Sequence, residues 1–244
     1  MAQEVNRNKG SFEKIVSAIK ESLKYPEINL EVNSVFTPET INLLSESIQF
    51  IMGLDVPHIH FSLSSIKPWD QASLLKLEKE IIKLRKIVLA HYERNGNNPV
   101  VNFIEEKRKG IFYCSAGKDR LAITPEGEIW GCYLFADYFR GKENTPQYQK
   151  FYFGTLANFI KNYNNIYPLI SSNYAHLSMD NLSTSNGKCF LCSELENCAV
   201  CPINASFSGV PLGKIPNYVC QIRKIMIREK GNFKKEFQAI IGNG

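Results

Sequence analysis

Cysteine is the residue type with the clearest capacity for chemistry in this sequence. Of seven cysteines in 244 residues, five lie between Cys189 and Cys220. Several are separated by only two residues, which lets both sulfurs of a pair reach one metal centre. Thiolates held in tight loops bind soft metals, either zinc or the irons of an iron–sulfur cluster. The full set is Cys114, Cys132, Cys189, Cys192, Cys198, Cys201 and Cys220.

Disulfide bonds are a weaker interpretation of these cysteines. Seven is an odd number, and residues 1–10 are polar, without the apolar core of a signal peptide. We therefore expect a cytoplasmic, reducing location, where clustered thiols more often bind metal. The five residues between the two close pairs are few for a zinc finger. A structural zinc-binding module and buried free thiols are the alternatives.

The order of the cysteines resembles a known pattern. Twelve residues separate Cys114 from Gly127, four more precede Cys132, and a CxxC-x5-CxxC run is followed after eighteen residues by Cys220. This pattern, over residues 112–220, resembles the SPASM domain, the auxiliary-cluster module of radical S-adenosylmethionine (radical SAM) enzymes that mature peptides and sulfatases. One departure is visible, because the family has three residues within the second close pair and this chain has two.

The resemblance implies two [4Fe–4S] clusters with interleaved ligands. Some relatives add a fourth cysteine soon after the first, but residues 115–121 contain none. The first cluster would then have one iron open to water, substrate or another side chain. His176 is a candidate for that position, against the more usual surface or hydrogen-bonding role of a histidine. The implied ligands are Cys114, Cys132 and Cys201 for the first cluster, and Cys189, Cys192, Cys198 and Cys220 for the second.

The chain upstream of the cysteines alternates between helix and strand. Asp70 has the form of an N-cap, and Thr37-Pro38-Glu39 combines a capping hydroxyl, a proline and an acid as at a helix start. The alternation predicts right-handed crossovers and a parallel sheet. The expected elements are helices at residues 11–24, 37–52 and from 71 to about 91, and strands at residues 28–36, 58–64 and 100–104.

Three parallel strands are too few to close a barrel. Residues 1–105 are therefore expected to form a partial parallel (β/α) barrel, similar to the later strands of the radical SAM barrel. The polar side of the second strand suggests that it lines a cavity, since packed parallel strands are usually apolar. The resemblance then puts four residues near S-adenosylmethionine or substrate, although satisfied polar positions within a strand are the competing interpretation. These residues are Asn33, Ser34, His60 and Ser62.

A charged connector at residues 105–110 is expected to precede a second domain over residues 112–244. This domain is predicted to be a small irregular α+β iron–sulfur module with a β-hairpin that turns at residues 125–127. The fold class is thus α/β, with a partial barrel half followed by a SPASM domain. Further expected segments are a polar loop at 136–150, a helix at 156–170, and two C-terminal segments at about 219–230 and 232–241.

Composition excludes other classes of protein. The chain is 44% hydrophobic and 22% charged, as in ordinary globular domains. It contains no apolar run near the roughly 18 residues of a membrane span. Its net charge of +5 is too small to indicate nucleic acid binding. Neither a membrane nor a nucleic acid is therefore expected as a partner.

The CxxxCxxC motif that defines radical SAM enzymes is absent, because no cysteine precedes Cys114. We expect the chain to correspond to the C-terminal portion of a radical SAM/SPASM maturase, whose auxiliary clusters transfer electrons or bind a peptide or protein substrate. S-adenosylmethionine would bind only in a longer parent protein. The alternative is a noncatalytic electron-transfer or peptide-binding partner of a separate maturase. Other expected partners are an electron donor or acceptor protein and the missing N-terminal barrel half.

Overall fold

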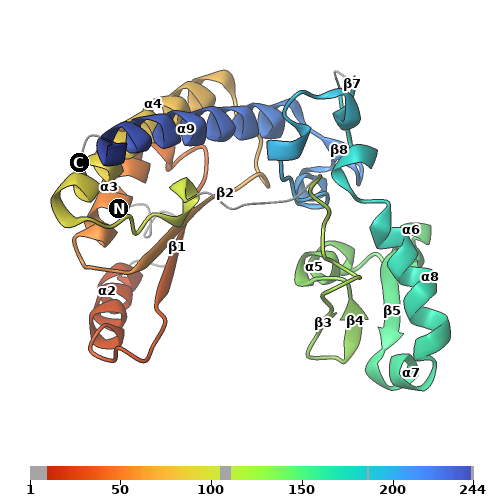
Figure 1. Cartoon of the computed structure of the whole chain (residues 1–244). Helices are drawn as coiled ribbons and strands as arrows, with labels where there is room; N and C mark the ends of the chain where they lie inside the picture. Colours follow the sequence, from red (N-terminus) through yellow and green to blue (C-terminus); the bar gives the residue numbers. More distant parts are fainter. Residues whose placement is uncertain (1–9, 105–110, 186, 243–244) are drawn as a thin grey trace. The chain divides into compact units, whose positions relative to one another are not determined.

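The computed structural model describes residues 10–104, 111–185 and 187–242. It divides the chain into two compact units, coloured along the sequence in Figure 1. The first unit combines Met1–Lys107 with Gln221–Gly244, and the second is Arg108–Cys220. The charged connector predicted at residues 105–110 lies outside the described residues. Among the helices described, none combines the length and apolar character that a membrane span requires.

A two-stranded parallel sheet lies at the centre of the first unit. β1 (Glu31–Phe36) pairs in register with β2 (His58–Leu63) along its whole length. α3 (Leu44–Met52) connects the two strands and packs against α4 (Gln71–Asn95), which follows β2. α2 (Ser11–Ser22) precedes β1. The predicted parallel crossover is present, but the sheet forms no closed barrel. Buried apolar side chains of this unit include Ile41, Leu44, Ile48, Leu77, Ile81, Leu84 and Val88.

The helix starts show which capping signals operate in the fold. Asp70 Oδ1 accepts a hydrogen bond of 2.8 Å from the backbone N–H of Ser73, as the sequence predicted for the start of α4. The helix-start signal predicted at Thr37 does not begin an α-helix. The Thr37 N–H donates to Thr40 Oγ1 over 3.0 Å, which forms a turn. A short 3-10 helix η1 (Ile41–Leu43) follows, so α3 begins later than predicted.

The prediction of a third strand at residues 100–104 is wrong. Val100 makes one isolated bridge to Ile59, and the chain then turns into the 3-10 helix η2 (Val101–Phe103). The Asn102 side chain accepts from the Phe61 N–H and donates to the Phe61 carbonyl, each over 2.9 Å. One amide side chain thus satisfies both backbone groups of Phe61, which a third strand would have paired.

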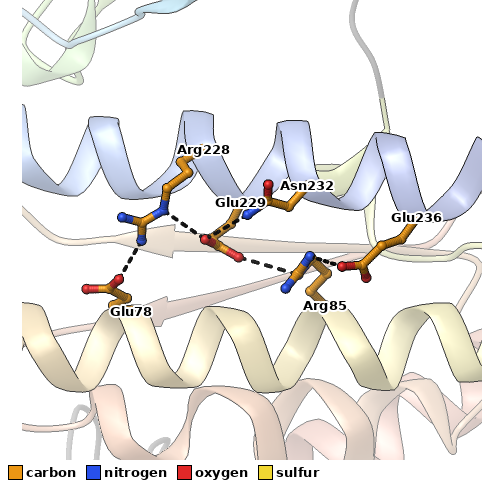
Figure 2. Close-up of polar contacts among 6 residues, drawn as sticks. All are labelled: Glu78, Arg85, Arg228, Glu229, Asn232 and Glu236. Carbon is orange, nitrogen blue, oxygen red and sulfur yellow. Dashed lines mark hydrogen bonds and ion pairs between the residues drawn. The ribbon is translucent and has the colours of Figure 1, made fainter.

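The C-terminal segment belongs to the first unit rather than to a domain over residues 112–244. A single helix, α9 (Asn217–Gly242), replaces the two predicted segments, and from Gln221 onward it is part of the first unit. It runs beside α4, where ion pairs join the two helices (Figures 1 and 2). Aromatic side chains add to this contact. Phe233 lies 4.8 Å from Phe103 between ring centroids, and Phe237 lies 4.5 Å from Tyr92.

A three-stranded antiparallel sheet carries the first part of the second unit. The predicted hairpin is confirmed with shorter strands, and Gly127 at its turn has the positive φ of 79° that glycine tolerates best. Two helices replace the polar loop predicted at 136–150, because their aromatic side chains enter the core. The elements are β3 (Ala122–Ile123), β4 (Glu128–Trp130), α5 (Tyr133–Phe139), α6 (Pro146–Phe151), β5 (Tyr152–Thr155), α7 (Leu156–Lys161) and α8 (Tyr163–Ala175).

Short strands and 3-10 turns form the remainder of the second unit, in keeping with the irregular fold predicted there. β6 lies between β7, which is antiparallel to it, and β8, which is parallel. The elements are η3 (Met179–Asn181), β6 (Ser183–Thr184), β7 (Gly187–Lys188), η4 (Cys189–Leu191), η5 (Leu195–Asn197), η6 (Asn204–Ser208) and β8 (Lys214–Ile215).

Candidate metal centre

All seven cysteines lie in the second unit as free thiols. Cys114, Cys132 and Cys201 pack against its aromatic core, although they come from three distant parts of the sequence. Burial raises the pKa of the Cys132 thiol, and the neighbouring thiols of Cys114 and Cys201 raise it further. The backbone N–H groups of Phe135 and Leu134 oppose this shift by hydrogen bonding to the sulfur. The fold therefore brings these three sulfurs close enough for the thiols of Cys114 and Cys201 to affect the pKa of Cys132.

Tyr174 holds the two loops that carry Cys114 and Cys132. Its hydroxyl accepts a hydrogen bond of 2.9 Å from the Gly131 N–H and donates one of 2.7 Å to the Phe151 carbonyl. Its ring lies so close to Gly117 and Gly131 that a Cβ on either glycine would overlap it. The Gly117 N–H also donates to the Gly131 carbonyl over 3.2 Å.

Sequence reasoning missed Tyr174, which is only 1% exposed. The pKa of its hydroxyl is raised, first by burial and then by the nearby thiols of Cys132 and Cys114. A signal was present in the glycines, since one immediately precedes Cys132 and another follows Cys114 by three residues. Glycine beside a candidate ligand indicates close approach of the backbone to another group, but it does not say which group.

Two cysteines of the second group, Cys189 and Cys198, lie in a different apolar cluster. Cys189 is buried there, and Cys198 packs against the same residues. Burial raises the pKa of the Cys189 thiol, and the thiols of Cys220 and Cys192 raise it further. The residues of this cluster are Met179, Leu182, Cys189, Val200, Ile215 and Val219.

Consecutive short turns set the spacing in the second group. The Cys192 N–H donates to the Cys189 carbonyl over 2.9 Å, and the Leu195 N–H donates to the Cys192 carbonyl over 3.1 Å. The Cys198 N–H then donates to the Leu195 carbonyl over 3.3 Å. Each turn is closed by a hydrogen bond between residues three apart in the sequence. The CxxC spacing of the sequence is therefore the spacing of one such turn.

Cys198 and Cys201 face different environments although two residues separate them. Cys198 packs with the cluster around Cys189, and Cys201 packs with the aromatic core around Tyr174. Their neighbours follow the same division, because Val200 is buried in the former cluster and Ile203 in the latter. The chain thus passes from one group of thiols to the other within this short segment.

The donor set consists of cysteine thiols in two groups, which are donors that both zinc and iron–sulfur clusters accept. Within the part of the chain that is described, no three His, Cys, Asp or Glu side chains are arranged to ligate one metal ion. A zinc ion needs its thiolates within about 2.3 Å of one point, whereas the cysteines of a [4Fe–4S] cluster bind separate irons. His176 is exposed at the end of α8, so its role as a further ligand stays a prediction.

The polar residues predicted near a cavity in the first unit are brought together only in part. Asn33 lies opposite His60 in the register, and Ser62 Oγ donates to Asn33 Oδ1 over 3.1 Å. Ser34 lies opposite Phe61, on the other face of the sheet. A cavity of about 570 Å³ lies between α2, β1 and α3, and both Asn33 and Ser34 line it. His60 and Ser62 are not among its lining residues.

Comparison with known proteins defines the class of the fold. No protein-family model matches the sequence, and no curated protein matches it. A solved structure of histidine-tagged anSMEcpe with bound AdoMet is similar to this chain, with a TM-score of 0.57 and 13% sequence identity. The similarity covers 95% of this chain and 62% of that chain.

The matched protein, anSMEcpe, is a radical SAM/SPASM sulfatase-maturating enzyme. The resemblance expected from the cysteine spacing is therefore confirmed for the fold. The chain spans somewhat less than two thirds of the length of that enzyme. What the match shows is a mixed α/β fold with short sheets that is similar to the fold of that enzyme.

Proposed function

We propose that this chain binds two [4Fe–4S] clusters and forms the C-terminal portion of a radical SAM/SPASM peptide or protein maturase. Cys114, Cys132 and Cys201 would hold the first cluster. Cys189, Cys192, Cys198 and Cys220 would hold the second. When bound, such clusters would supply electron transfer or an iron site for a substrate group.

The observation that carries the proposal is the separation of Cys198 from Cys201. Adjacent cysteines that served one zinc ion would be expected in one cluster of side chains. Here they pack against different cores, Cys201 with Cys114 and Cys132, and Cys198 with Cys189. The mutual influence of the thiols on the pKa values of Cys132 and Cys189 supports the same two groups.

A second candidate is a noncatalytic electron-transfer or peptide-binding partner of a separate maturase. The observation in its favour is that no cysteine precedes Cys114, so this chain has no CxxxCxxC motif. On either proposal the chain alone does not cleave S-adenosylmethionine. An in-frame CxxxCxxC upstream in the gene would favour the first candidate, and its absence would favour the second.

Metal and sulfide analysis of protein purified without oxygen tests the cluster proposal. We expect about eight irons and a similar amount of acid-labile sulfide per chain, as two [4Fe–4S] clusters require. Added thiol or peptide should alter the spectrum, because the first cluster has an iron without a cysteine ligand. Two zinc ions per chain with no sulfide would exclude the clusters and assign a structural zinc-binding module.

A further inference from the structure

The outer surface of α7 and α8 in the second unit carries large apolar side chains and no carboxylate. Residues 144–179 contain neither aspartate nor glutamate, although 24 of the 244 residues of the chain are acidic. Ile160 of α7 is 69% exposed, Leu169 of α8 is 66% exposed and Tyr163 is 47% exposed. A solvated helix surface normally carries charged side chains of both signs, so this composition needs an explanation. Further exposed positions of the two helices are Asn158, Asn164, Asn165 and Ser172.

This composition is typical of a surface that binds another polypeptide. The centres of protein–protein interfaces are depleted of charged residues and enriched in tyrosine, and asparagine and serine are common in binding surfaces. The aromatic part of the surface is also held in place. Tyr163 stacks on Tyr167 with 5.2 Å between ring centroids, and the Tyr167 hydroxyl donates a hydrogen bond of 2.6 Å to the Lys118 carbonyl. A partner would therefore lose little side-chain freedom on binding these rings.

Cations predominate at the border of this surface. The bond from Tyr167 places the segment of Lys118 against α8, and the Asn173 side chain does the same for Lys150 by donating to its carbonyl over 2.8 Å. The Leu156 N–H donates to the Gly127 carbonyl over 2.8 Å, so the hairpin turn lies at the start of α7. In these bordering segments the exposed carboxylates are Asp119 and Glu126. The cations that outnumber them are Lys118, Arg120, Lys150 and Lys161.

We propose that the outer surface of α7 and α8 binds an acidic peptide, whose apolar side chains pack on Ile160, Tyr163 and Leu169 and whose carboxylates meet the bordering cations. Complementary charge at the border would fix the orientation of the peptide, and the apolar centre would supply the burial. The role of this peptide as the substrate segment of a maturase rests on the proposed function. α8 connects the surface to the first candidate cluster, because Tyr174 on the same helix contacts the glycines beside two of its cysteines.

Other occupants fit this surface less well. Two copies of this chain would bring two basic borders together, and each chain carries a net charge of +5. A nucleic acid gains most of its affinity from contacts between cations and phosphates, whereas the centre of this surface is apolar. An acidic peptide satisfies both the apolar centre and the basic border.

Binding of synthetic peptides to the full chain, purified without oxygen, tests this inference. The probe is a fluorescently labelled peptide of about twelve residues in which glutamates separate leucines and phenylalanines. A second peptide has glutamine in place of each glutamate, and a third has lysine. Fluorescence anisotropy measures the dissociation constants. We expect the glutamine peptide to bind about tenfold more weakly than the acidic one, and the lysine peptide more weakly still. Added salt should weaken binding of the acidic peptide.

Matched substitutions place the binding on α7. Ile160→Ser removes an exposed apolar contact and Lys161→Glu reverses a bordering charge, and each should weaken binding of the acidic peptide about tenfold. Leu75→Ser and Lys76→Glu make the same changes at two exposed, adjacent positions of α4 in the first unit and should leave binding unchanged. Equal binding of the three peptides, or equal effects of the α7 and α4 substitutions, would overturn the proposal.

Further measurements separate this inference from its alternatives. Tighter binding of a single-stranded oligonucleotide or of anionic lipid vesicles, lost in Lys161→Glu, would assign the surface to that partner and overturn the proposal. A dimer in light scattering that Ile160→Ser abolishes would assign it to a second copy and also overturn it. Iron is measured in the same preparations. Iron-loaded chain that binds no peptide would refute this inference alone, whereas peptide binding by a chain without iron would support it and refute the clusters alone.

Discussion

Arg85 of α4 and Glu229 of α9 form an ion pair inside the first unit, with 3.4 Å between Nε and Oε2 (Figure 2). The two side chains are only 10% and 3% exposed. Within the described residues neither of these two atoms has a hydrogen-bond partner of good geometry, so each depends on the opposite charge. Around them, Glu236 binds Arg85, and Arg228 binds Glu229 at 2.9 Å and Glu78 at 2.7 Å. This network fixes which turns of α4 and α9 lie side by side.

Removing one partner of the buried ion pair should lower the free energy of unfolding substantially. Glu229→Gln leaves the Arg85 charge without its buried counterpart, which typically costs about 3–5 kcal/mol of unfolding free energy. The double variant Arg85→Met with Glu229→Leu should lose less than Glu229→Gln, because no buried charge remains. Urea unfolding measures both. Glu21→Gln breaks the exposed pair with Lys24 and should cost less than about 1 kcal/mol. Equal losses for the single and double variants would contradict this account.

Tyr174 should be required for the stable packing of the two loops that carry Cys114 and Cys132. Tyr174→Phe keeps the ring but leaves the Gly131 N–H and the Phe151 carbonyl without the hydroxyl, which we expect to cost about 1–3 kcal/mol. Gly131→Ala should be at least as damaging, because its Cβ would overlap the ring. Denaturant unfolding followed by near-UV circular dichroism checks both variants. The control Tyr163→Phe, at a residue that is 47% exposed, should change little.

Single cysteine variants should separate the two proposed clusters. Cys201→Ala should empty or weaken the first site, and Cys198→Ala the second, although only two residues separate them. Iron analysis should find roughly half the metal in each variant. Electron paramagnetic resonance of the remaining cluster should differ between them, because the two sites have different ligands. Cys220→Ala should resemble Cys198→Ala. Identical spectra for the Cys198 and Cys201 variants would contradict the assignment of these two cysteines to different clusters.

Glu39 should contribute a small acid-sensitive part of the stability. Hydrogen bonding from Thr37 and then from Lys67 lowers the pKa of this carboxyl from 4.5 to about 2. A lowered pKa in the folded state stabilises the protein above the unfolded value, and this stability is lost as pH falls from about 4.5 through about 2. Because the side chains are exposed, the effect should stay below about 1 kcal/mol.

The Glu39→Gln variant tests this prediction. Unfolding free energies are measured from pH 6 down to acid, with the exposed α2 variant Glu13→Gln as a control for the loss of one surface charge. The variant should be less stable than the parent chain near pH 6 and should converge with it at low pH. A constant difference between them at all pH values would show that the carboxylate charge is not responsible.

Local patterns in the sequence predicted much of the fold and the short spacing of some candidate ligands. The Asp70 cap, the turn at Gly127 and the parallel pairing of the first two strands each depend on residues close in sequence or on a strong periodicity. The spacing of Cys189 and Cys192 is similarly local, because this pair spans one three-residue turn. The interleaved ligand sets came from the resemblance, and only ligation experiments test them.

Tertiary structure decided those features that depend on contacts between residues far apart in the sequence. The third strand is absent because the Asn102 side chain takes the backbone groups of Phe61, 41 residues away. α9 belongs to the first unit because Glu229 and the aromatic residues beyond it meet α4, which no local pattern indicates. Tyr174 reaches glycines beside two cysteines from the last turn of α8, which lies beyond the end of the helix predicted at residues 156–170. A sequence determines turns and periodic faces through neighbouring residues, whereas the partner that a buried polar or aromatic group finds is set only when the chain has packed.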